Sequence, residues 1–88
     1  MLEEAKQDLK KIIIAENSEE YYYKLIADRV AKLHQFKEVG DTVFGKDDEL
    51  FRGEVLKSTV LKNQELDDTK QAYELVMTEI ALDVFISN

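Results

Sequence analysis

The residue types that carry most enzyme chemistry are scarce in this chain. Its 88 residues include one histidine and no cysteine, which excludes a thiolate zinc site, a cysteine nucleophile and a disulfide. The acids clustered at 47–49 and 67–68 lack the alternating oxygen ligands and the glycine of a calcium loop, and they are typical of helix starts. No serine stands in a nucleophile-elbow sequence. We therefore expect no metal, no cofactor and no catalytic residue.

Arg29 and His34 form the one pair whose spacing matches a catalytic motif. Their R-x4-H spacing resembles the R-x4–6-H motif of the HEPN ribonucleases, which are helical bundles that pair two such motifs across a dimer. The resemblance implies an RNA-cleaving enzyme that uses Arg29 and His34, although Val30 stands where that family usually carries a polar residue. The alternative, which we favour, is that Arg29 buries its aliphatic stem at the edge of the core and pairs with a carboxylate.

The charge balance constrains the partners. The 19 acidic residues outnumber the 12 Lys and Arg residues, which gives a net charge of −7, and residues 45–88 hold ten of the acids and five of the cations. This acidity disfavours direct binding of nucleic acid, because phosphate contacts need clustered Lys and Arg. An acidic surface can also imitate a nucleic-acid backbone, so an inhibitor of that kind remains an alternative.

Targeting signals are absent from the sequence as given. No apolar run approaches the roughly 18 residues of a membrane-spanning helix. The first residues are acidic and lack the basic start of a secretory signal. We therefore expect a cytoplasmic protein that does not bind membranes.

The scarcity of helix breakers predicts an all-α fold. With no proline and three glycines, the chain is expected to form a small bundle of three to four helices in one domain over residues 1–88. Apolar spacing predicts helices over about 2–15, 18–38, 47–62 and 64–86. Asn17 and Asn63 are expected to cap the second and fourth helices, and Gly40 to end the second, leaving 40–45 as a loop. A strand at 55–61 remains an alternative for the third segment.

The apolar faces of these helices predict the core. Its expected members are Leu9, Ile12, Ile13, Ile26, Val30, Leu33, Tyr73, Met77, Ile80 and Val84. The last helix carries a second apolar stripe nearly opposite the first, so it is either the central helix or faces a partner. Tyr22 fits the buried face of the second helix, and its two neighbouring tyrosines should be partly exposed.

The second stripe and the exposed aromatic residues predict association. A domain this small buries a limited core, and many such domains gain stability from a partner. We expect a homodimer, or a complex with another protein, formed through Leu75, Leu82, Ile86, Tyr21, Tyr23 and Phe44. The expected function is that of a non-catalytic binding protein: a regulator, inhibitor or assembly factor of the kind that bacteria and their phages encode.

Overall fold

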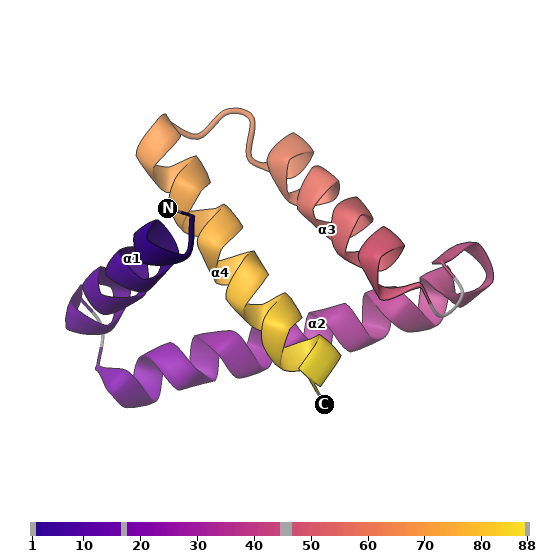
Figure 1. Cartoon of the computed structure of the whole chain (residues 1–88), viewed down its shortest axis with the longest axis horizontal. Helices are drawn as coiled ribbons and strands as arrows, with labels where there is room; N and C mark the ends of the chain where they lie inside the picture. Colours follow the sequence, from indigo (N-terminus) through magenta and orange to yellow (C-terminus); the bar gives the residue numbers. More distant parts are fainter. Residues whose placement is uncertain (1, 17, 45–46, 88) are drawn as a thin grey trace.

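The chain folds into helices, and Figure 1 shows their arrangement in a computed structural model. The structure describes residues 2–16, 18–44 and 47–87, and the side chains of all of these except 2, 3, 5, 6 and 40–44. These residues form four helices and no strand: α1 (Leu2–Glu16), α2 (Glu19–Phe44), α3 (Asp48–Lys62) and α4 (Asp68–Ser87). The all-α expectation is therefore confirmed, and the third segment is a helix.

The last helix lies in the middle of the bundle. In Figure 1, α2 runs along one side, and α1 and α3 turn back from its two ends. α4 crosses between α1 and α3 and packs against each of the other three helices. A helix covered on several sides needs apolar residues on several sides, which explains the two stripes in its sequence.

Short polar side chains cap the N-termini of three of the helices. The Ser18 hydroxyl accepts a hydrogen bond of 3.2 Å from the Tyr21 backbone N–H, at the start of α2. Asp47 and Asp67 do the same for α3 and α4, accepting from the backbone N–H of Leu50 at 3.0 Å and of Lys70 at 2.8 Å. Each bond satisfies one backbone donor that the helix itself leaves unpaired.

Two expected helix ends are wrong, and one expected cap lies outside the described residues. Asn63 caps the C-terminus of α3 instead of starting α4: its Nδ2 donates to the Thr59 carbonyl at 2.8 Å, and Asp67 starts α4. α2 continues through Gly40 to Phe44, because glycine permits the left-handed conformation that ends a helix but does not require it, and no proline follows. Asn17 is outside the described part of the chain.

The core consists of two clusters that share α4. One cluster joins α1, α2 and α4 through Ile13, Tyr22, Ile26 and Met77. The other joins α2, α3 and α4 through Leu33, Phe51, Val55, Ala81 and Leu82. Met77, from the first stripe of α4, belongs to one cluster, and Leu82, from the second stripe, belongs to the other.

The core prediction is right in part. Ile13, Ile26, Leu33 and Met77 are buried, and Leu9, Val30, Tyr73 and Ile80 pack at the cluster edge. Two expected members, Ile12 at 52% and Val84 at 38%, are exposed. For Ile12 the reason is the rotation of α1, which directs its neighbour Ile13 inward instead.

Candidate interaction site

The residues predicted to bind a partner lie in several different environments. Tyr21 and Tyr23 are exposed on α2, and Leu75 and Ile86 are half-buried on α4. The expectation that Leu82 lies on the surface is wrong, because α3 covers that side of α4 and Leu82 is fully buried beside Phe51 and Val55. The remaining predicted contact, the Phe44 side chain, is outside the described residues. The second stripe of α4 is therefore not one continuous docking surface.

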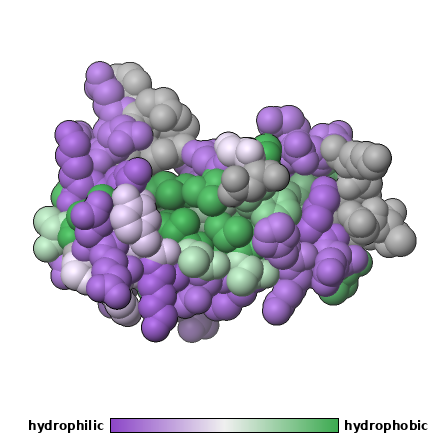
Figure 2. Space-filling model, turned by 90° about the horizontal axis from the view of Figure 1, so that it is seen from below, coloured by the Kyte–Doolittle hydropathy of each residue, from purple (hydrophilic) through white to green (hydrophobic). Residues whose placement is uncertain are grey.

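A groove of about 410 Å³ opens where α2 crosses α4, with one residue of α1 at its edge. Its lining is mostly apolar: Lys10, Tyr22, Tyr23, Ile26, Ala27, Val30, Ile80 and Val84. Ala27 on α2 and Val84 on α4 are exposed at this crossing, and Ile80 on α4 is half-buried. Figure 2, which views the molecule from the α2 side, shows hydrophobic side chains gathered in the middle of this face between hydrophilic ones.

The lining of the groove is suited to contact with an apolar surface. Its volume is within the range of about 300–1,000 Å³ that small-molecule sites occupy. Its titratable residues are Lys10 and two tyrosines, so no carboxylate or histidine is present to act as an acid or base. Shape and apolar area are what this surface offers a ligand.

The Tyr22 hydroxyl is buried without a hydrogen-bond partner among the described residues. Burial raises the pKa of this phenol above its ordinary value of 10.0, and the neighbouring Tyr23 and Tyr73 raise it further. The group is therefore neutral at physiological pH, and its contribution to the site is the ring and not the charge.

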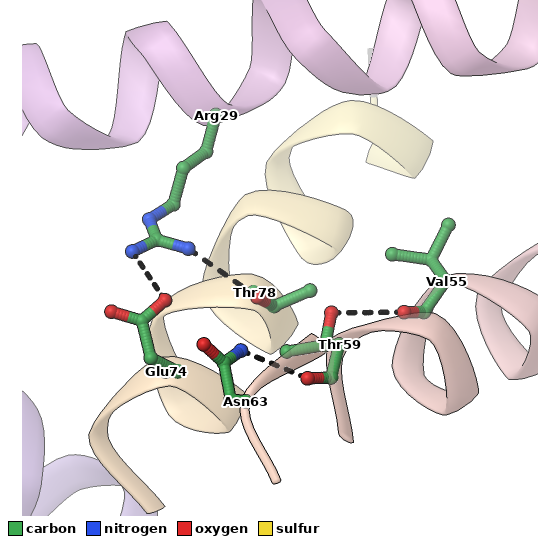
Figure 3. A network of polar contacts seen from close by, with 6 residues as sticks. All are labelled: Arg29, Val55, Thr59, Asn63, Glu74 and Thr78. Carbon is green, nitrogen blue, oxygen red and sulfur yellow. Dashed lines mark hydrogen bonds and ion pairs between the residues drawn. The ribbon is translucent and has the colours of Figure 1, made fainter. Parts of the chain in front are cut away.

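Arg29 belongs to a polar network between the helices (Figure 3). Its Nη2 forms an ion pair of 3.0 Å with Glu74 Oε2, and its Nη1 donates to the Thr78 hydroxyl at 3.5 Å. On the α3 side, the Thr59 hydroxyl donates to the Val55 carbonyl at 2.9 Å. The favoured alternative for Arg29, a core-edge arginine paired with a carboxylate, is the arrangement found.

Within one chain, the side chains of His34 and Arg29 contact different residues of α4 and do not form a shared site. Its ring packs edge-on against Phe85, with 4.6 Å between ring centroids. Arg29 contacts Glu74, eleven residues before Phe85, and this spacing corresponds to about 16 Å along a helix. The two side chains of the HEPN-like spacing therefore engage distant parts of α4.

Sequence reasoning missed the groove because the signal for it is weak. The predicted core includes Val84, and no apolar stripe or motif of the sequence includes Ala27. The one available clue is the pair of alanines at 27 and 31, which share the exposed side of α2 and present little side chain over the crossing with α4. Whether such a pair exposes a neighbouring helix depends on how the helices cross, which the spacing alone does not determine.

The described part of the chain contains neither a group of metal-ligating side chains nor a membrane-spanning helix. Among those residues, no three histidine, aspartate or glutamate side chains come together as ligands of a metal ion. Searching the same residues, we find no helix with the length and hydropathy needed to span a bilayer.

Fold and site together define an all-α protein with an apolar groove where α2 crosses α4. Comparisons with protein-family models, with curated proteins and with solved structures found no match.

Proposed function

We propose that this protein acts by binding another protein, with no catalysis of its own, and that the groove between α2 and α4 is its docking surface. The observation that supports this most directly is the apolar lining of the groove on a chain of which 35% is charged. A groove of this shape accepts the apolar face of an amphipathic helix, a common mode of protein recognition. The partner is another protein or a second copy of this chain, met in the cytoplasm.

The exposed tyrosine at the groove supplies a contact of the kind that interfaces favour. Tyr23 is 58% exposed, and its hydroxyl donates to Glu19 at 3.4 Å. Tyrosine offers a large rigid ring with a polar tip, which is why it is enriched where proteins meet. Tyr21, Leu75 and Ile86 remain predicted contacts, but none of them lines this groove, whereas Leu82 is left out because it is buried.

The Val84→Asp substitution tests the docking surface. A carboxylate in the groove has to be desolvated when a partner binds, so we expect association to weaken by at least about tenfold. The measurements are the solution mass by light scattering and quantitative capture of partners from host extract. Leu61→Asp, at an exposed position of α3 that does not line the groove, is the matched control.

Three outcomes would contradict the proposal. One is a wild-type protein that is monomeric and captures no partner. Another is a Val84→Asp variant that keeps the wild-type mass and partners while circular dichroism shows an intact fold. The third is cleavage of RNA that disappears in both Arg29→Ala and His34→Ala, which would establish the ribonuclease alternative.

A further inference from the structure

A second cleft lies between α2 and α3, with α4 as its floor. It consists of two cavities of about 260 and 140 Å³ that share Lys32, Leu33, Val55 and Thr59. The inner cavity is completed by Arg29, Thr78 and Ala81, and the outer one by Phe36, Ser58 and Lys62. These residues lie on a different face of α2 from the groove, so neither site depends on the other.

The charge of this cleft is opposite to that of the whole molecule. Three cations line it (Arg29, Lys32 and Lys62), and no carboxylate does, although the chain carries a net charge of −7. Glu74 neutralises part of the charge through its ion pair with Arg29. The two lysines are exposed, and no ion pair is found for either among the described residues. A local excess of about two positive charges therefore remains.

At the inner end of the cleft, a polar residue, Thr78, occupies a buried position of the kind that apolar residues usually fill. Thr78 is the one buried polar residue among those described, with 7% of its surface exposed. Its hydroxyl accepts from Arg29, and the guanidinium is held in place by Glu74. Arginine has five N–H donors, so these two bonds leave further donors for a ligand. Arg29 and Glu74 are partly exposed, so an oxyanion that enters the cleft can reach the remaining donors of the guanidinium.

We propose that this cleft binds a small phosphate monoester. Such a group carries about −1.5 to −2 charge at neutral pH, which matches the excess of positive charge. Arg29 and the two lysines face its oxygens with charge-assisted hydrogen bonds. The hydroxyls of Ser58 and Thr78 add neutral donors, whereas the Thr59 hydroxyl already donates to the Val55 carbonyl. Leu33, Val55 and Phe36 contact the apolar part of the ligand, which is small because the larger cavity lies below the usual range for ligand sites.

The test uses phenyl phosphate and inorganic phosphate as probes at constant ionic strength. We expect saturable NMR shifts confined to the cleft and a rise in melting temperature, with phenyl phosphate binding more tightly because its ring contacts Phe36. The variant Lys32→Ala/Lys62→Ala should weaken binding by at least about tenfold. Its matched control, Lys24→Ala/Lys57→Ala, removes one exposed lysine from each of the same helices outside the cleft and should bind as the wild type does.

Thr78→Val separates a binding role from a structural one. It keeps the shape of the side chain and removes the hydroxyl, so we expect weaker phosphate binding without loss of thermal stability. The proposal is overturned if neither probe gives a saturable shift, if the two double variants lose binding equally, or if Thr78→Val binds phenyl phosphate as tightly as the wild type.

Discussion

The Tyr22 hydroxyl is a polar group buried in the core without a partner. The tyrosine ring fills the space between α1, α2 and α4, where it is almost completely covered. Its oxygen is shielded from water and has no hydrogen-bond partner among the described residues. Burying a polar group in this way typically lowers the free energy of unfolding by about 1–3 kcal/mol. The ring stabilises this cluster, and the hydroxyl reduces what the ring contributes.

Removing that hydroxyl should therefore stabilise the protein. We expect Tyr22→Phe to raise the free energy of unfolding by about 1 kcal/mol, measured by urea denaturation. Tyr23→Phe is the control, since its exposed hydroxyl donates a long hydrogen bond of 3.4 Å to Glu19 and its loss should change stability little. A Tyr22→Phe variant less stable than the wild type would show that the hydroxyl has a partner.

The same variant has a signature at alkaline pH. Because the folded pKa of Tyr22 lies above its ordinary value of 10.0, the unfolded chain loses this proton first as the pH rises. The stability from the neutral phenol is fully present below pH 10 and is lost as the pH rises toward the folded pKa. Tyr22→Phe should therefore lose less stability above pH 10 than the wild type does. Equal losses would contradict the raised pKa.

At the scale of the helices, Gly53 is a weak point of α3. An added Cβ would meet no atom within 4 Å, so alanine fits there without displacing anything. We expect Gly53→Ala to stabilise the protein by about 1 kcal/mol, since glycine in a helix interior costs roughly that much. Thermal and urea unfolding provide the measurement. Ala31→Gly, at an exposed interior position of α2, should give the opposite change, and a destabilising Gly53→Ala would show that α3 needs the glycine.

Local signals in the sequence were enough to predict that each helix exists. They were not enough to predict several of the helix boundaries. The absence of proline, the apolar spacing and the acidic helix starts were enough to predict four segments. The predicted end of α2 is wrong because a glycine can lie inside a helix as well as just after its last turn. Asn63 was assigned to the wrong helix, because asparagine caps either end and only the path of the chain decides which.

The packing of α3 could not be predicted from its own residues. Its apolar side chains point in several directions, so no single stripe identifies Phe51 and Val55 as core residues. They are buried because α2 and α4 together form a concave surface that accepts them. The same contact buries Leu82, so this residue of the second stripe faces a neighbouring helix and not a partner. The groove could not be predicted for a related reason, since it depends on how α2 and α4 cross at Ala27 and not on Ala27 alone.

At the scale of the whole molecule, the two core clusters should unfold together. α2 and α4 contribute to both, so losing one cluster removes the support of the other. Of the four tyrosines, Tyr22 lies in the cluster of α1, α2 and α4 and Tyr73 packs against it, and none lies in the other cluster, so changes in tyrosine fluorescence report on this cluster. We expect Phe51→Ala, in the other cluster, to lower the tyrosine-detected urea midpoint, with a loss of about 3–5 kcal/mol. Circular dichroism should give the same midpoint.

Met77→Ala is the companion variant, because it opens a cavity in the tyrosine-containing cluster itself. Both variants should show one transition by both probes. Two separate transitions, with the tyrosine signal unchanged in Phe51→Ala, would show that the clusters are independent units.

The central position of α4 has a consequence for biosynthesis. The ribosome makes α1, α2 and α3 before α4, yet both core clusters need residues of α4. Until residues 68–87 leave the exit tunnel, the apolar faces of the first three helices have nothing to close over. Neither core cluster can be completed before the last helix has been made, so apolar side chains of the first three helices stay exposed on the nascent chain until then.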